Sequence, residues 1–496
     1  MVKKSLHQWQ FGDFQTPSQL AQKIVTILAD DYHLNPDLIL EPTCGKGSFL
    51  RAAIYRWEQA KVIGFDINYD YVEQAKESIQ EISNCEGVLI QQGDFFQINW
   101  NDLLKQYSGN KLLVFGNPPW VTSSDLSLIN SQNCPTKSNF QNRRGLEAIT
   151  GLANFDVSEW MLLQYVDWLS DREGSLAIIC KYSVARKVIK QVRKKYQKQR
   201  FFAHIYPIDT KLYFGITVSA CLFILTTDQG NADCEIYPTL DSKMPSHVIG
   251  EREGLIVNDV KQYEKWKHLR GQSSPYIWRS GVKHDCAKVM ELEPLGKGYK
   301  NGFGEIIHLE SEFIYPLLKS SDVGNSRIQS YRKVILMTQR FLREDTSHIK
   351  ELAPKTWDYL NHYQDLFLAR KSSIYKNQPL YSIFGVGAYT FKPWKIAISG
   401  FYKKLNFCLV GLMNEKPVIF DDTVIFLSFD LEGEARFIFN ILTSEPATQF
   451  LESIIFWDEK RPITANILKQ LSIPKLAKQM GNLQEYQSWI QKHSSI

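Results

Sequence analysis

The first half of the chain alternates short apolar runs with segments in which apolar residues recur at helical spacing. The apolar runs predict strands at residues 38–41, 61–66, 87–96, 111–116 and 174–183. The segments between them predict helices at 49–60, 69–82 and 160–169, the last with Asp156 as its cap. Alternation of this kind is typical of a parallel sheet with helices on both faces, so we expect an α/β, Rossmann-like fold for this half.

Polar residues stand at the ends of four predicted strands. Glu41, Asp66, Asp94 and Asn117 each close or follow an apolar run. In open parallel sheets the carboxyl ends of the strands meet at one edge, and ligands bind just beyond it. We therefore expect these four side chains to face a common ligand.

Composition narrows the class of protein. The 496 residues leave room for two or three domains, and the net charge of +5 permits a nucleic-acid partner without requiring one. The 8 cysteines form no C-x-x-C pair and no Cys/His cluster at zinc spacing, which predicts reduced thiols, a cytoplasmic protein and no metal site. The N-terminus lacks the apolar core of a signal peptide, and no run approaches ~18 apolar residues, so no membrane span is expected.

The turn after the first strand has the sequence CGKGS, residues 44–48, and its two glycines would let the backbone approach a ligand closely. It lacks the Lys-Ser/Thr pair that closes a phosphate-binding loop. Ser48 is expected to cap the helix that follows. An ordinary tight turn is the alternative interpretation of Gly45 and Gly47.

The acids after the next two strands have the chemistry of a nucleoside site. Asp66 can accept hydrogen bonds from both hydroxyls of a ribose. Asp94 can accept from an adenine amino group while Phe95 packs on the ring. Singly, Asp66 could be a turn former and Asp94 an ordinary strand exit. In combination, and without a phosphate grip, they indicate an adenosine that carries no phosphates, and S-adenosylmethionine fits that description.

The fourth strand runs into the sequence NPPW, in which two consecutive prolines freeze the chain just past the strand end. The Asn117 side-chain oxygen and the Pro118 carbonyl can both accept hydrogen bonds from an exocyclic aromatic amine. Two such acceptors pull the nitrogen toward tetrahedral geometry and stabilise the positive charge that develops during attack on a methyl group. Pro119 helps to fix the carbonyl, and Trp120 offers a flat face on which a base can stack.

The order of these motifs resembles the gamma class of DNA amino-methyltransferases, the class typified by the TaqI adenine methyltransferase. The motifs are FQTPSQLAQKIV, LEPTCGKGSFL, GFDIN, GDFF, NPPW and a later VSA strand. The resemblance implies a class I methyltransferase domain over residues 1–228, with S-adenosylmethionine as cofactor. It further implies site-specific methylation of an adenine N6 that is flipped out of DNA, as in type II restriction-modification systems.

The resemblance also assigns roles to single residues. Asn117, Pro118, Pro119 and Trp120 would form the catalytic motif, and Phe214 would supply a second ring against the target base, with Tyr213 as the alternative. The residues implied in cofactor binding are Thr16, Pro17, Glu41, Gly45, Gly47, Asp66, Ile67, Asp94, Phe95 and Asn117.

Two positions of the motif bear on the substrate. Trp120 stands where Tyr or Phe is commonest in the class, which keeps a stacking face and excludes a hydroxyl role. Asn117 stands where cytosine-N4 enzymes more often have Ser, so the resemblance favours adenine N6, with DNA cytosine N4 as the nearest alternative. An RNA or protein amide methyltransferase and a catalytically silent DNA-binding subunit are more distant alternatives.

Two further segments of this half are candidates for DNA contact. Residues 121–155 are polar, and they contain Arg143 and Arg144, which could contact DNA beside the site; a solvent-exposed insertion is the alternative. The basic run 186–200 could follow phosphates, or it could be an amphipathic helix with a solvated basic face.

From residue 229 on, the alternation of strands and helices fades. Residues 229–270 are predicted to connect two domains, and residues 271–496 to form a mixed α+β target-recognition domain. Segments that resemble the target-recognition halves of modification enzymes are 315–323, 353–372, 381–404 and 420–427. Within 381–404, an ordinary aromatic-packed sheet is the alternative to a DNA groove. Candidate phosphate contacts there are Lys392, Lys395, Lys403 and Lys404.

No nuclease-like set of acids appears in a convincing strand context, so a stand-alone methyltransferase is expected. Its expected partners are double-stranded DNA and, by association alone, a separately encoded restriction endonuclease; a methyltransferase without a nuclease is equally compatible. A monomer is expected because it suits recognition of an asymmetric site.

Overall fold

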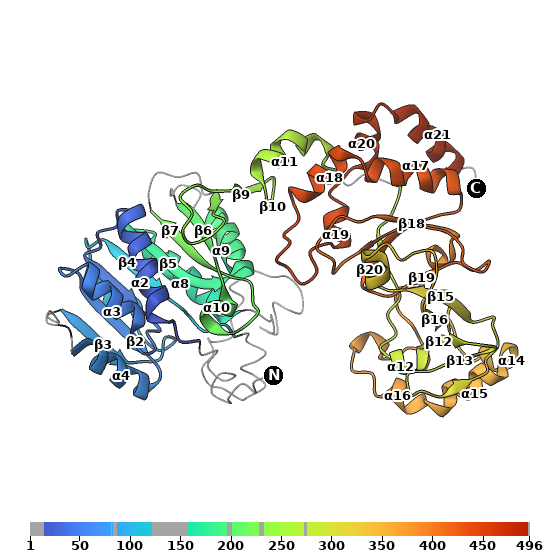
Figure 1. Cartoon of the computed structure of the whole chain (residues 1–496), viewed down its shortest axis with the longest axis horizontal. Helices are drawn as coiled ribbons and strands as arrows, with labels where there is room; N and C mark the ends of the chain where they lie inside the picture. Colours follow the sequence, from blue (N-terminus) through green and yellow to red (C-terminus); the bar gives the residue numbers. More distant parts are fainter. Residues whose placement is uncertain are drawn as a thin grey trace. The chain divides into compact units, whose positions relative to one another are not determined.

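The computed structural model describes residues 14–80, 82, 87–121, 156–195, 201–227, 233–271 and 275–494. The chain divides into two compact units, Met1–Val260 (unit 1) and Lys261–Ile496 (unit 2) (Figure 1). In the part of the chain that is described, no helix is long and apolar enough to cross a lipid bilayer.

Unit 1 is built on a 10-stranded sheet. From one edge to the other its strands are β10 (Leu255–Val257), β9 (His247–Arg252), β8 (Cys234–Ile236), β6 (Phe202–Ile208), β7 (Ala220–Thr226), β5 (Gly174–Lys181), β4 (Leu112–Gly116), β1 (Leu38–Glu41), β2 (Lys61–Asp66) and β3 (Val88–Gln92). The strands from β3 to β5 pair in parallel, and β7 lies antiparallel between β5 and β6. This order confirms the expected α/β architecture.

The central strands are apolar because both faces of the sheet are covered. All residues of β1 and β4 are buried, as expected for parallel strands between two layers of helices. The carboxyl ends of β1, β2 and β4 lie along one edge of the sheet, which brings Glu41, Asp66 and Asn117 to that edge.

Helices cover both faces of this sheet. The described α-helices are α2 (Ser18–Thr26), α3 (Ser48–Arg56), α4 (Tyr69–Gln80), α5 (Trp100–Lys105), α8 (Val157–Leu169), α9 (Tyr182–Lys195) and α10 (Thr210–Phe214), and a π-helical turn, Ile27–Asp31, continues α2. Apolar residues of α2, α3 and α4 share one core with β1, β2, β4, β5 and β7. Helices α8 and α9 contact β5 through residues outside that core, on the opposite face.

Ser48 and Asp156 were the expected N-caps of two helices, and the structure bears out only Asp156. Helix α3 begins at Ser48, but its N-cap is Gly47, with φ of 79°, and no side chain caps it. The expected Ser48 cap is therefore wrong. Gly47 is needed because a Cβ there would lie 3.0 Å from the Cβ of Ala75 in α4. Helix α8 starts as expected, since the Asp156 side chain accepts a hydrogen bond from the Ser158 N–H.

Residues 234–257 belong to the sheet of unit 1. β8 pairs in parallel with β6, and β9 and β10 extend the sheet as antiparallel strands. The predicted connecting segment, 229–270, thus differs from the structure over its described part. β9 and β10 lie at an edge of the sheet and are only half-buried, so their sequences carry little of the apolar signal that marks β1 and β4. β8 is largely buried but only three residues long, which is too short to show a periodicity.

Unit 2 contains two smaller sheets. The six-stranded sheet has the order β14 (Ile306–Ile307), β13 (Gly298–Lys300), β12 (Glu291–Leu295), β16 (Lys333–Leu336), β15 (Ile314–Leu318) and β19 (Ile419–Phe420). The four-stranded sheet has the order β11 (Arg279–Ser280), β20 (Val424–Phe429), β17 (Trp394–Ser399) and β18 (Cys408–Val410). The described strand pairs are antiparallel, apart from the parallel pair β15 and β19.

Helices complete this unit, and its mixed α+β composition is as expected. The described α-helices are α11 (Val260–Trp266), α12 (Ala287–Met290), α13 (Ser320–Gly324), α14 (Ile349–Leu352), α15 (Pro354–His362), α16 (Gln364–Leu368), α17 (Glu432–Leu442), α18 (Glu445–Glu452), α19 (Ala465–Leu468), α20 (Ile473–Gln479) and α21 (Leu483–Ser494). Short 3₁₀ turns occupy Lys267–Leu269, Ser373–Tyr375 and Ala388–Phe391. Separate apolar cores lie against the six-stranded and the four-stranded sheet.

Lys395 lies inside unit 2 and not on a DNA-facing surface. It is 1% exposed, and its Nζ donates hydrogen bonds to the carbonyls of Val418 at 2.7 Å and Lys392 at 3.0 Å. The expectation that Lys395 contacts a phosphate is wrong, because its position in β17 turns the side chain into the interior. Burial lowers the pKa of Lys395 to about 7.

Replacing Lys395 should therefore flatten the pH dependence of stability. The unfolded chain, with an ordinary lysine pKa of 10.5, binds a proton that the folded chain releases above a pH of about 7. Wild-type stability should thus rise with pH across this window, and Lys395→Met should remove that rise. Thermal unfolding midpoints measured from about pH 6.5 to 9 test this. The exposed Lys403→Met is the control, and parallel curves for wild type and Lys395→Met would contradict the prediction.

Candidate active site at the strand ends

A cavity opens in unit 1 beyond the carboxyl ends of β1, β2 and β4. Its empty volume is about 870 Å³, with open solvent included. Its walls come from Phe14–Thr16, the turn 41–45, the end of β2 with residues 66–68, Gly93, Phe95 and Phe96 after β3, Asn117 and Pro119 after β4, and Ser48, Phe49, Tyr71 and Met161 from three helices.

One carboxylate folds the glycine turn onto the end of β2. Asp66 accepts hydrogen bonds from the Gly45 N–H at 2.8 Å and the Asn68 N–H at 2.9 Å. Gly45 has φ of 50°, and a Cβ there would lie 2.5 Å from the side-chain oxygen of Gln15. That same oxygen accepts a hydrogen bond from the Lys46 N–H at 3.0 Å. The turn is therefore held from two sides, by Asp66 and by Gln15.

Glu41 is a buried carboxyl beside this turn. It is 2% exposed, and its Oε2 has no hydrogen-bond partner among the described residues. Burial, and then the neighbouring charge of Asp66, raises the pKa of Glu41 well above its ordinary value, although a backbone hydrogen bond from Leu50 lowers it. A cationic group brought to this oxygen would favour the ionised carboxylate.

The amide of Asn117 is held in one orientation. Its Nδ2 donates a hydrogen bond to the Phe14 carbonyl at 2.7 Å. A carbonyl oxygen can only accept, so this bond decides which end of the amide is the donor. The other end, Oδ1, is buried and has no partner among the described residues. Asn117 thus brings an unused acceptor to the cavity wall, and this is the group that the predicted amine-binding role requires.

Three aromatic rings gather beside Asn117. Trp120 lies 5.4 Å from Phe14 and 5.5 Å from Phe214, measured between ring centroids. Trp120 is 7% exposed, and its Nε1 donates to the Ile179 carbonyl at 3.4 Å. The structure therefore brings the two expected stacking rings together and adds Phe14. Because so little of the indole is exposed, a base can stack on it only if Phe14 or Phe214 moves.

The strand exit after β3 differs in part from the expected adenine contact. Phe95 lines the cavity, and its ring lies in an aromatic cluster with Trp100, 5.1 Å away. Asp94 is not among the described lining residues. Its carboxylate instead accepts from the Phe96 N–H and from the Gln97 side chain, each at 2.9 Å. This geometry favours the strand-exit interpretation of Asp94, and Phe96 takes a place on the wall.

The remaining predicted cofactor residues divide into two groups. Thr16 and Ile67 line the cavity, whereas Pro17 and Gly47 stand next to lining residues in the chain and are not themselves among those described as lining it. The same holds for Pro118 of the predicted catalytic motif. The lining residues that were not predicted from the sequence include Phe14, Gln15, Asn68, Tyr71 and Met161. Phe14 and Gln15 directly precede the Thr-Pro pair and could have been found from that position, but Met161 and Tyr71 reach the cavity only because α8 and α4 pack beside it.

The candidate DNA-contacting residues have different surroundings. Arg143 and Arg144 lie outside the described residues. Lys392 forms an ion pair with Asp430 at 2.7 Å, while Lys403 and Lys404 are exposed. The described part of the basic run 186–200 lies in α9, which buries one apolar face, as in the amphipathic interpretation.

The chain is similar to known proteins in both sequence and fold. Residues 5–292 match the family described as N-6 DNA Methylase. The chain is 44% identical over 472 residues to the type II methyltransferase M.NspV of Nostoc sp., across 95% of this chain and 97% of that protein. Its fold is similar to that of the type IIL restriction-modification enzyme MmeI, solved in complex with DNA, with a TM-score of 0.53 and 12% identity over 92% of this chain and 64% of that one. The similarity to MmeI concerns the fold alone.

Gly116→Ala should disturb the carboxyl ends of β1 and β4, where Glu41 and Asn117 lie. Gly116 has φ of 138°, and a Cβ there would lie 3.2 Å from Cγ and Oε1 of Glu41. Backbone strain of this kind costs about 1–3 kcal/mol, and the crowding adds displacement of a buried carboxyl. We expect a lower unfolding midpoint and an affinity for S-adenosylmethionine reduced about tenfold or more, measured by calorimetric titration.

The matched control is Gly109→Ala. Gly109 has φ of 86°, but an added Cβ there would meet nothing within 4 Å. It carries backbone strain without crowding, so it should lose stability and keep its affinity for S-adenosylmethionine. Equal affinities in the two variants would contradict the role given to the contact between Gly116 and Glu41.

Proposed function

The chain belongs to the N-6 DNA methylase family, and we propose that its strand-end cavity is the site at which it methylates the N6 amine of adenine in DNA. The chain is an adenine-specific DNA methyltransferase of the type II restriction-modification kind, and its methyl donor is S-adenosylmethionine. The observation that carries the proposed site is the buried, unused Oδ1 of Asn117 at the cavity wall.

The lining residues fit the parts of S-adenosylmethionine. Asp66 would accept from the ribose hydroxyls while it holds the glycine turn. Glu41, buried and with one oxygen unpartnered among the described residues, would pair with the α-amino group. Ile67, Phe95 and Phe96 offer apolar surface to the adenine. S-adenosylmethionine, when bound, supplies an electrophilic methyl group on a sulfonium.

The protein's task in the transfer is to hold the target amine. The lone pair of adenine N6 is delocalised into the ring, which makes it a poor nucleophile. A hydrogen bond to Asn117 Oδ1, with a second to the Pro118 carbonyl, would localise that lone pair and stabilise the positive charge that develops on N6. On transfer, a carbon–nitrogen bond would form as the carbon–sulfur bond breaks, the sulfur would keep the electron pair as a neutral thioether, and the methylated amine would then lose a proton to water. No general base of high pKa is needed, because the methylated aminium is strongly acidic.

Access for the base would involve the aromatic group beside Asn117. A flipped adenine costs a few kcal/mol to unstack and unpair, and stacking on aromatic rings offsets that cost. Trp120 and Phe214 would receive the base once Phe14 has moved aside. Phe14 would otherwise cover the indole and keep its apolar face away from water.

A DNA substrate has consequences for the role of unit 2, for a partner enzyme and for the place where the enzyme acts. Unit 2 would recognise the target sequence, and a separately encoded endonuclease would cleave the unmethylated site. The enzyme would act as a monomer in the cytoplasm, where its DNA is.

The proposal is tested by identifying the methylated base. The protein is incubated with isotopically labelled S-adenosylmethionine and unmethylated genomic DNA, which is then digested to nucleosides and analysed by mass. The expected product is N6-methyladenine. Labelled N4-methylcytosine, or no label in DNA from protein that binds the cofactor, would contradict it.

Asn117→Ala should lower the rate of methyl transfer about 10²–10³-fold and leave cofactor binding nearly unchanged. The variant removes the acceptor for the amine but none of the contacts proposed for the ribose or methionine groups. Loss of a preorganised oxygen or nitrogen partner of this kind typically lowers kcat about 10²–10³-fold. Single-turnover methylation and calorimetric titration of S-adenosylmethionine measure the two effects separately. Equal loss of both would assign Asn117 a structural role.

Asp66→Ala should instead weaken cofactor binding. It removes the acceptor of two backbone N–H groups and the proposed ribose contact, and charge-assisted hydrogen bonds are worth about 1.5–3 kcal/mol each. The dissociation constant for S-adenosylmethionine should rise about 10- to 100-fold, with kcat at saturation much less affected. Asp66→Asn keeps one acceptor and should lie between alanine and wild type. An unchanged dissociation constant with a lower kcat would refute the ribose role.

A further inference from the structure

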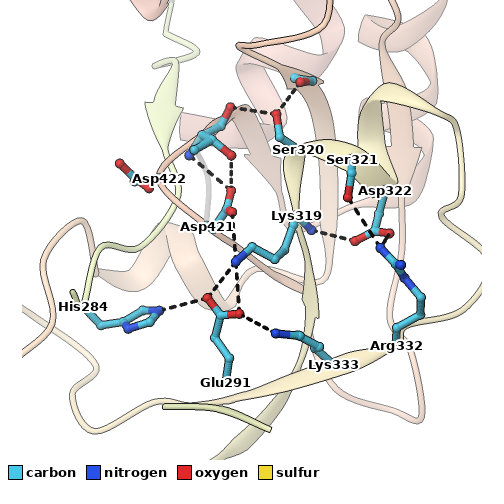
Figure 2. Close-up of polar contacts among 12 residues, drawn as sticks. His284, Glu291, Lys319, Ser320, Ser321, Asp322, Arg332, Lys333, Asp421 and Asp422 are labelled. Carbon is cyan, nitrogen blue, oxygen red and sulfur yellow. Dashed lines mark hydrogen bonds and ion pairs between the residues drawn. The ribbon is translucent and has the colours of Figure 1, made fainter. Parts of the chain in front are cut away.

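Two of the segments that resemble target-recognition motifs meet in unit 2. Residues 315–323 form β15 and α13, and residues 420–427 form the end of β19 and part of β20. β15 and β19 pair in parallel, so Lys319 and Asp421 follow at the same end of neighbouring strands, with 3.8 Å between Nζ and Oδ2 (Figure 2). Ser320 reaches the Thr423 carbonyl at 3.5 Å. The two motifs thus form one polar junction.

A buried carboxylate holds two lysines at this junction. Glu291, at the start of β12, is 5% exposed. It accepts hydrogen bonds from Lys319 Nζ at 2.8 and 3.0 Å and from Lys333 Nζ at 3.0 Å, and His284 Nε2 lies 3.6 Å away (Figure 2). Burial raises the pKa of Glu291, but the hydrogen bonds from these three groups outweigh burial and hold that pKa below its usual range. The lysines therefore have defined positions at neutral pH.

A second buried carboxylate holds Arg332. Asp322, 5% exposed, accepts from Arg332 Nη2 at 2.6 Å and from the Lys319 N–H at 3.0 Å (Figure 2). The Arg332 side chain is 67% exposed. Nη2 also donates a long hydrogen bond to Ser321 Oγ at 3.5 Å, while no partner is described for the Nε and Nη1 hydrogens among the residues that the structure describes. Nη2 is thus anchored by Asp322, and Nε and Nη1 are presented to solvent.

The two lysines, Asp322 and Arg332 line a second cavity, whose empty volume is about 990 Å³ with open solvent included. Its wall contains the cations Lys319, Arg332 and Lys333, the carboxylates Glu293 and Asp322, and also Pro294 and Tyr331. A wall that contacts phosphates is expected to be uniformly basic, whereas the cations here are already paired and two carboxylates stand beside them. Base edges in the major groove offer acceptors and donors side by side, so a wall of both signs fits base edges better.

We propose that this cavity reads a base pair of the target DNA, with Arg332 donating two hydrogen bonds to O6 and N7 of a guanine. The assignment rests on the proposed function, since it needs DNA to be the substrate. Arg332 is the side chain suited to guanine because its fork matches two neighbouring acceptors. Asp322 is a positioning residue, which fixes the direction of the fork before DNA arrives.

The test compares the sequences that variants methylate. Wild type, Arg332→Ala and Arg332→Lys are incubated with S-adenosylmethionine and the same unmethylated genomic DNA, and every N6-methyladenine is mapped by sequencing. Arg327→Ala is the matched control, because Arg327 also lies by Asp322, at 3.6 Å, but does not line the cavity. Unfolding midpoints are measured for each protein.

Both Arg332 variants should accept other bases at one G·C position of the motif, with discrimination there reduced about 5- to 150-fold. Arg327→Ala should keep the wild-type motif. Asp322→Asn should relax the same position less strongly, a change that a purely structural role would not produce. An unchanged motif in the Arg332 variants would overturn the proposal. The proposal would also be overturned if the variants bound all DNA sequences more weakly by the same factor. If the slope of log affinity against log salt concentration also fell by about one, Arg332 would be a phosphate contact. A wild type that methylates no adenine would instead refute the proposed function.

Discussion

A single hydrogen bond, from Asn117 Nδ2 to the Phe14 carbonyl, decides the chemistry of the first cavity. Because the donor end of the amide is occupied, only an acceptor remains for a ligand. The segment that supplies this carbonyl also places Phe14 against Trp120 and Gln15 against the glycine turn. The strand ends, the turn and residues 14–16 are thus one hydrogen-bonded assembly, and a disturbance in any part of it would change where the amide oxygen lies.

The site keeps polar groups unsatisfied inside an apolar core. Glu41 Oε2 and Asn117 Oδ1 are both buried without a partner among the described residues, and a group of this kind costs about 1–3 kcal/mol. The parallel sheet can carry that cost because strands such as β4 are buried along their whole length between two layers of helices. A ligand that forms hydrogen bonds with these two oxygens removes this free-energy cost. The same atoms therefore contribute to the binding energy and to the orientation of the reacting groups.

Unit 2 uses buried charge in a different way. Glu291 and Asp322 are nearly inaccessible, and each fixes cations that reach a cavity, so long and flexible side chains are ordered before any ligand arrives. Lys395 is instead a cation that does not reach a cavity, because its side chain is buried in the interior. A lysine in an aromatic, basic segment has the composition of a phosphate contact, yet its ammonium group satisfies interior carbonyls. Composition does not distinguish these cases, because both depend on the face of a strand to which a side chain points.

The sequence alone was sufficient for the family, the α/β fold of unit 1 and several residues of the wall of its cavity, because apolar periodicity and polar strand ends are local signals and parallel strands bring their ends to one edge. It was not sufficient for Phe14, Met161 or Arg332, nor for the short strand β8 and the half-buried strands β9 and β10. The carboxylate of Asp94, expected at the adenine, accepts hydrogen bonds from the Phe96 N–H and the Gln97 side chain. Those features depend on packing between segments distant in sequence, where the direction of a side chain follows from the neighbours that surround it. Only the tertiary structure determines that direction, and with it whether a charged residue contacts a ligand or stabilises the interior.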